Sequence, residues 1–157
     1  MKIVLNKYRE FAKYINKEIK VKQCELDWYC YPSLKLIEMP KFETEEGKKD
    51  FLKSIEKKLP QDKKDYLNYV PENVWSFLHE VGHIQNNHNS RSLIRIISNL
   101  LGQLGLEKIA NLFYFQMKEE REATQWAIDY VLHNEEIVFK FSNEIYKSYK
   151  RYCKSCN

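Results

Sequence analysis

The chain has 157 residues, of which 43% are hydrophobic and 14% aromatic, so it is long enough and apolar enough to bury a core. This composition excludes a disordered chain, and we expect one domain that covers residues 1–157. The formal net charge of +4 comes from lysines interleaved with acidic residues, without the basic stripe typical of a nucleic-acid surface, so we expect no direct nucleic-acid binding.

No segment of the sequence is typical of export or of a membrane span. Residues 1–9 are charged and lack the apolar core of a signal peptide. The most apolar stretch, 93–115, is interrupted by charged and amide side chains and is not clean enough to cross a bilayer. We therefore expect a cytoplasmic protein with no membrane partner.

The N-terminal part of the chain predicts a helix, a small sheet and a second helix. Apolar residues at helical spacing predict the first helix over 7–19. Between 21 and 40, aromatic and branched residues favour two or three short strands that form a small sheet. Thr44 is a favourable helix start, and the helix that follows it ends before Pro60.

The stretch 73–84 contains the pattern H-E-x-x-H and predicts a helix, with Pro71 in its first turn. His79 and His83 lie one helical turn apart on the same face, where two imidazoles can bind one metal ion. Glu80 can reach a metal-bound water as a general base. We expect this helix to bury a broad apolar surface and to turn its polar stripe towards a cleft. The alternative is a pair of surface histidines beside an ordinary glutamate.

The polar stretch 85–90 contains a further histidine, His88. In the three-histidine metalloproteases, the last histidine ligand lies six residues after the second, a position that Asn89 occupies here. We therefore interpret His88 as a loop residue and not as a metal ligand.

Three further helices are predicted in the C-terminal half, over 92–104, over 106–133 and from about Glu135 onwards. The last of them carries an apolar stripe typical of packing. The four cysteines form two pairs in the sequence, Cys24 with Cys30 and Cys153 with Cys156. We expect free thiols, while the C-x-x-C spacing of the second pair leaves a disulfide or a structural metal open.

A catalytic zinc site has three protein ligands and one water, so the two histidines require a third protein ligand. Glu120 and Glu122 are both candidates, and the helical period shows that they point in nearly opposite directions. Glu120 lies in the middle of the apolar face of its helix. The residues that share this face are Phe113, Met117, Ala127 and Val131. Glu122 lies on the opposite, solvent-facing side with Lys118, Gln125 and Asp129. Since a buried carboxylate is unfavourable without a cation, we predict Glu120 as the third ligand; the alternatives are a buried pair with Arg or Lys, or a helix with a different phase.

Two segments resemble the ImmA/IrrE-type zinc metallopeptidases: 74–84, an apolar helix with H-E-V-G-H, and 118–132, which includes E-R-E-A-T-Q-W-A. The residues that match the zinc ligands of that family are His79, His83 and Glu120, and the residue that matches its catalytic base is Glu80. Thr124 stands where the wider superfamily often has Asp or Asn, and Trp126 replaces the usual phenylalanine. The resemblance implies limited proteolysis of a partner protein, such as a transcriptional repressor of a phage, a mobile element or a stress response.

We thus expect an α+β fold, a mostly helical single domain with a small N-terminal sheet packed on the H-E-x-x-H helix, that binds one Zn²⁺ per chain. The expected reaction is peptide-bond hydrolysis, in which zinc activates water and Glu80 transfers the proton. Tyr130 and His133 are candidates for holding the oxyanion. Two alternatives stay open: a zinc-stabilised protein-binding module without catalytic activity, and an interaction protein without metal that uses the apolar surface 93–115.

Overall fold

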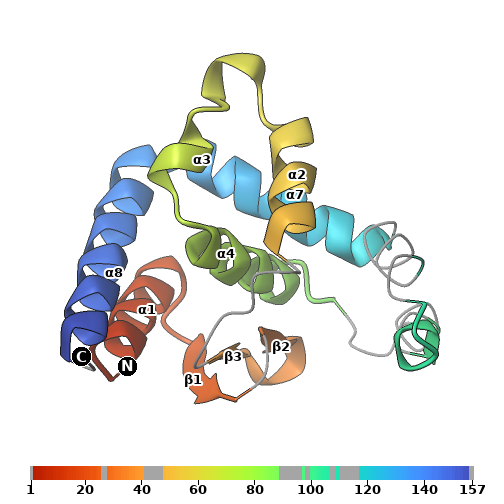
Figure 1. Ribbon diagram of the computed structural model, residues 1–157, viewed down its shortest axis with the longest axis horizontal. Coiled ribbons are helices and arrows are strands. Elements are labelled where there is room, and N and C mark those ends of the chain that lie inside the picture. Colours follow the sequence, from red (N-terminus) through yellow and green to blue (C-terminus); the bar gives the residue numbers. More distant parts are fainter. Residues whose placement is uncertain are drawn as a thin grey trace.

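A computed structural model describes residues 2–25, 28–40, 48–88, 97, 100–106, 109 and 117–155, and for 48–50 and 152–155 it describes the backbone only. Helix α4 (Glu72–Gln85), which carries the H-E-x-x-H pattern, lies at the centre, and the other elements pack around it (Figure 1). Pro71 is its N-cap and not its first helical residue, one position earlier than predicted.

Two long helices pair on one side of the molecule, α1 (Lys2–Ile15) and α8 (Glu135–Ser155) (Figure 1). The rings of Phe11 and Phe141 stack between them with their centroids 4.5 Å apart. The predicted start of the last helix at Glu135 is confirmed.

The first helix differs from the predicted range 7–19 at both ends. It begins earlier because Val4 and Leu5 also lie on its buried face. It ends at residue 15 because Asn16 Oδ1 accepts a hydrogen bond of 3.0 Å from the backbone N–H of Glu18. Such a local bond competes with the helix and turns the chain.

The sheet has three short strands. They are β1 (Lys20–Cys24), β2 (Tyr29–Tyr31) and β3 (Leu36–Pro40), with a 3₁₀ turn (Pro32–Leu34) between the last two. Strand β3 lies in the middle, parallel to β1 and antiparallel to β2. Val21 and Cys30 flank Ile37 in the register, and all three are buried on the face that packs against the helices. The predicted small sheet and the mostly helical α+β fold are confirmed.

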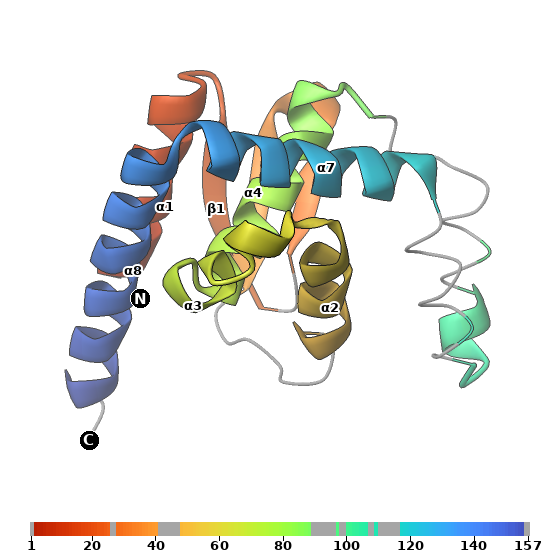
Figure 2. The same cartoon turned by 90° about the horizontal axis from the view of Figure 1, so that it is seen from above.

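The remaining labelled helices are α2 (Lys48–Lys58), α3 (Tyr66–Tyr69) and α7 (Lys118–His133), and a 3₁₀ turn (Gln61–Lys63) precedes α3. Helix α7 crosses α4, and α2 lies beside both (Figure 2). The predicted helix over 106–133 therefore starts too early: Met117 has an extended ψ of 138° and caps a helix that begins at residue 118. The predicted start at Thr44, and Phe113, lie outside the described residues.

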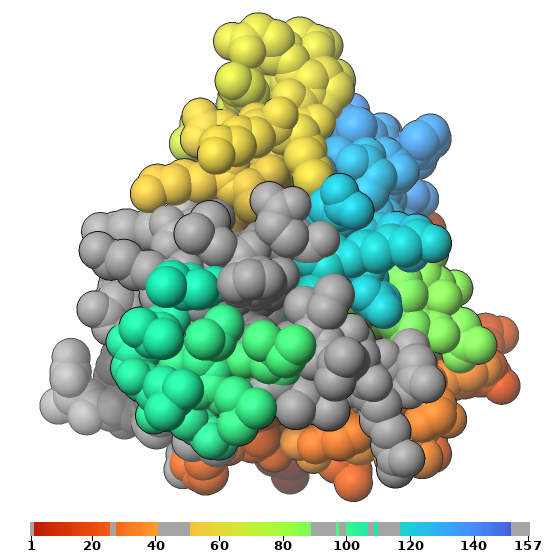
Figure 3. All heavy atoms as spheres, turned by 90° about the vertical axis from the view of Figure 1, so that its right-hand side faces the viewer, coloured from red at the N-terminus to blue at the C-terminus, as the bar shows by residue number. Residues whose placement is uncertain are grey.

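The described part of the apolar stretch 93–115 lies on the surface (Figure 3). Its exposed large side chains are Ile97, Leu100, Leu104, Leu106 and Ile109. Residues 97 and 100–103 are helical, in agreement with the predicted helix over 92–104. Within the described residues, no helix has both the length and the apolar character needed to cross a membrane. Cys24 and Cys30 form no disulfide, as expected.

Candidate metal centre

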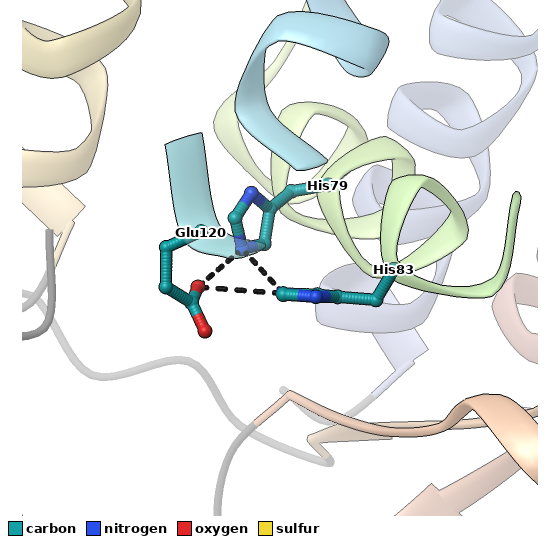
Figure 4. Close-up of side chains that lie close together, drawn as sticks. All are labelled: His79, His83 and Glu120. Atoms are coloured by element: carbon teal, nitrogen blue, oxygen red, sulfur yellow. Dashed lines mark hydrogen bonds and ion pairs between the residues drawn. The ribbon is translucent and has the colours of Figure 1, made fainter. Parts of the chain in front are cut away.

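Three buried side chains from two crossing helices meet at one point (Figure 4). His79 and His83 extend from α4, and Glu120 extends from α7. The Nε2 atoms of the two histidines are 3.2 Å apart, and Glu120 Oε2 lies 3.0 Å from His79 Nε2 and 3.3 Å from His83 Nε2. The structure thus brings together the three residues predicted as metal ligands.

The close contact between the two helices depends on Gly82. A Cβ atom at this position would lie 2.6 Å from the carbonyl oxygen of Ala123 and 2.9 Å from its Cα, which is shorter than van der Waals contact permits. Without a side chain at Gly82, the backbones of α4 and α7 can touch. Because His79 lies one turn before Gly82 and Glu120 one turn before Ala123, this crossing brings the ligand side chains together. The sequence pattern alone does not predict this role of Gly82.

Glu120 lies in the first turn of α7, where the positive end of the helix dipole favours a carboxylate. Burial alone would raise the pKa of Glu120, but a proton on the nitrogen of His79 or His83 that faces it, within hydrogen-bonding distance, outweighs this effect and holds the pKa below its usual value. The side chain of Glu120 is 3% exposed, whereas that of Glu122 is 46% exposed. The predicted helical phase is therefore confirmed.

Thr124 fixes the orientation of His79. Its hydroxyl donates its only proton to the backbone carbonyl oxygen of Glu120 at 2.7 Å. Thr124 Oγ1 also lies 3.2 Å from His79 Nδ1, so it accepts the Nδ1 proton of that ring. A neutral imidazole has one N–H, and His79 Nε2 consequently presents a lone pair to Glu120. The sequence pattern did not assign this role to Thr124, although its position one helical turn after Glu120 places both residues on the same face of α7.

A metal ion fits this donor set. Ligands at about 2.0–2.1 Å from a tetrahedral zinc ion lie about 3.3 Å from one another. The three separations here, 3.0–3.3 Å, agree with that spacing. Two imidazole lone pairs and a carboxylate repel one another unless a proton or a metal cation lies between them. The group is therefore compatible with one metal ion.

Glu80, the predicted general base, directly follows His79 on α4 and is buried. Phe51 of α2 turns its ring edge towards the imidazole of His79, with the centroids 5.4 Å apart. The predicted polar stripe does not face an open cleft, because α7 packs against α4 and His79 and Glu80 are each 7% exposed.

Neither candidate for the oxyanion lies at this site. Tyr130 and His133 follow Glu120 by ten residues or more, which separates them from it by about 15 Å or more along the helix axis. Tyr130 stacks on Trp126 at 5.0 Å between centroids, and burial raises its pKa to about 12. His133 Nδ1 lies 2.6 Å from the backbone oxygen of Asp129. The helix therefore separates both candidates from the carboxylate of Glu120.

His88, predicted as a loop residue without a metal role, does follow the end of α4 and is not one of the three grouped ligands. Its side chain is nevertheless buried and lies against His83. Burial lowers the pKa of His88, although its hydrogen bond with Glu122 opposes this effect.

Comparison of the chain with protein-family models, with curated proteins and with solved structures finds no match. The chemistry of the site itself must therefore support any function. That chemistry consists of a buried three-ligand group with a carboxylate next to its first histidine.

Proposed function

We propose that this chain is a zinc-dependent metallopeptidase of the ImmA/IrrE type. The main support for the proposal is the buried group formed by His79, His83 and Glu120. Glu80, which directly follows His79 in the sequence, is also buried. A purely structural helix has no need for two adjacent histidines and a carboxylate in its core, because burying charge without a partner is costly.

Zinc is the metal that this donor set favours. Two imidazole nitrogens and one carboxylate oxygen form the His₂Glu set of catalytic zinc sites, which keep a fourth position for water or substrate. Hard cations such as Ca²⁺ and Mg²⁺ prefer an all-oxygen environment. The spacing of about one tetrahedral edge between the donor atoms supports the same choice.

Zinc in such a site supplies Lewis-acid activation of a water and of a carbonyl group. His79 and His83 would hold the metal through Nε2, since the outer nitrogen of each ring contacts a second side chain. Glu80 accepts the proton of the attacking water and passes it to the amine that leaves. Burial of the site strengthens these electrostatic interactions, since the effective dielectric constant is lower than in water.

The substrate that we propose is a partner protein cut at a limited number of sites, such as a transcriptional repressor of a phage, a mobile element or a stress response. Support for this substrate comes from the resemblance of 74–84 and 118–132 to the ImmA/IrrE-type enzymes. A cytoplasmic location belongs to the same proposal, since such repressors act there.

A second candidate is a zinc-stabilised protein-binding module without catalytic activity. One observation favours it: the three ligands are only 3–8% exposed, as in metal sites that stabilise a fold. The presence of Glu80 favours the peptidase over the binding module, because a structural metal site needs no general base beside its ligands.

Glu80→Gln tests the proposal. The variant keeps the size of the side chain but cannot accept the proton, so we expect unchanged zinc content and a loss of cleavage of about 100-fold or more. The measurement is cleavage of candidate repressors encoded by neighbouring genes, with Glu72→Gln on the same helix as the control. Cleavage at the wild-type rate by Glu80→Gln would remove Glu80 as the base. Stable binding of a repressor that the wild type never cuts would favour the binding module.

A further inference from the structure

His88 is placed next to His83 by the way helix α4 ends. Asn87 adopts a left-handed conformation with φ 52°. The backbone N–H of Asn87 donates to the carbonyl oxygen of Ile84, and that of His88 donates to the carbonyl oxygen of His83. These two bonds form a Schellman motif, in which asparagine tolerates the left-handed position. The turn brings the ring of His88 to 5.1 Å from that of His83, measured between centroids.

The contact joins the outer nitrogens of the two rings. His88 Nδ1 lies 2.9 Å from His83 Nδ1, whereas Nε2 of His83 faces His79 and Glu120. His88 therefore contacts the nitrogen of His83 that does not belong to the metal group. On its other side, His88 Nε2 lies 3.1 Å from Glu122 Oε2.

The positions of the protons follow from the hydrogen-bond partners. A carboxylate only accepts hydrogen bonds, so the contact with Glu122 requires a proton on His88 Nε2. A neutral imidazole has one N–H, which leaves His88 Nδ1 as an acceptor. His83 must then carry its proton on Nδ1 and donate it to His88. The lone pair of His83 is left on Nε2, the atom that faces the other two ligands.

We propose that His88, backed by Glu122, is a positioning residue that holds His83 in the tautomer and orientation needed to bind the metal ion; this inference rests on the metal site proposed above. Thr124 acts in the same way on Nδ1 of His79. The expectation that Glu122 merely faces water is thereby revised, because its half-exposed carboxylate orients His88. Glu120 and Glu122 of one helix thus act on the two opposite nitrogens of His83, the first directly and the second through His88.

Zinc affinity, measured by competition with a chelator, tests the inference first. His88→Ala should weaken binding by about 10- to 100-fold, the usual effect of removing the partner of a ligating histidine. His88→Gln should restore most of the affinity, because its amide oxygen can accept from His83 and its amide N–H can donate to Glu122. His133→Ala, which removes a histidine far from the site, should bind zinc like the wild type. Glu122→Ala should cause a smaller loss than His88→Ala, since water can replace a half-exposed carboxylate.

The tautomer of His83 gives a second readout that requires no metal. Imidazole nitrogen chemical shifts of the metal-free protein should show the Nδ1–H form of His83 in the wild type and a shift towards Nε2–H in His88→Ala. Should His88→Ala not fold, Glu122→Ala provides the same comparison. Unchanged zinc affinity together with an unchanged tautomer would overturn the inference and leave the metal site intact. If the wild type binds no zinc, the proposed function fails, and the tautomer of His83 alone decides the role of His88.

Discussion

Helix α4 is buried on both sides, but different interactions stabilise the two sides. Towards α1 and the sheet, the ring of Phe77 packs against Tyr8, Phe11 and Trp28, with centroids 5.2–6.4 Å apart. Towards α7, the buried groups are two imidazoles and a carboxylate, whose facing atoms lie 3.0–3.2 Å apart. The first side is a core that stabilises the fold by excluding water. The second side is stabilised only when its charges and lone pairs have a cation between them.

This difference shows which part of the molecule can respond to metal. The apolar side of α4 keeps its contacts with or without an ion, so it holds the helix in place. If the site binds zinc as proposed, the polar side should add to the free energy of unfolding by an amount that grows with the logarithm of the free zinc concentration. Substitutions on the two sides should therefore differ in how their effects depend on zinc.

The largest loss of stability is expected from Phe77→Ala. Removing this fully buried ring should lower the free energy of unfolding by about 3–5 kcal/mol. The loss should be the same with zinc and with a chelator, because the ring lies on the apolar side. Urea unfolding under both conditions provides the measurement, with the exposed Tyr146→Ala as a control that changes stability by about 0.5 kcal/mol or less. A loss that disappears when zinc is removed would break the distinction between the two sides.

A smaller effect is expected from Gly82→Ala, which acts where the two helices touch. The added methyl group collides with the backbone of Ala123 and should cost about 1–3 kcal/mol. It should also weaken zinc binding, because moving α7 away from α4 separates Glu120 from the histidines. Gly102→Ala is the matched control, since a Cβ atom there meets nothing within 4 Å. If Gly82→Ala folds and binds zinc like the wild type, the crossing does not set the position of Glu120.

The inward direction of Glu120 was predictable because helical periodicity is a local property. Apolar residues three, seven and eleven positions away define a face, and a carboxylate in the middle of that face stands out. The pair His79 and His83 was predictable for the same reason. The buried set on α7, which includes Ala123, Ala127 and Val131, agrees with the predicted phase.

The features that sequence reasoning missed depend on contacts between distant segments. The role of Gly82 appears only once Ala123 of another helix lies against it. The position of His88 depends on the left-handed residue Asn87, a conformation that the polar stretch 85–90 does not reveal by periodicity. The start of α7 was placed too early, since the apolar pattern runs on through residues ahead of 118 while the backbone at Met117 is extended.

The most direct test of the central claim is metal titration of the wild type beside Glu120→Ala and Glu119→Ala. The wild type should bind about one zinc ion per chain and gain about 2.7 kcal/mol of stability at a free zinc concentration 100 times the dissociation constant. Glu120→Ala should lose most of the affinity and most of that gain, because its carboxylate is the proposed third ligand. Glu119→Ala should behave like the wild type. A wild type that binds no zinc, or a Glu120→Ala variant that binds it unchanged, would contradict the account.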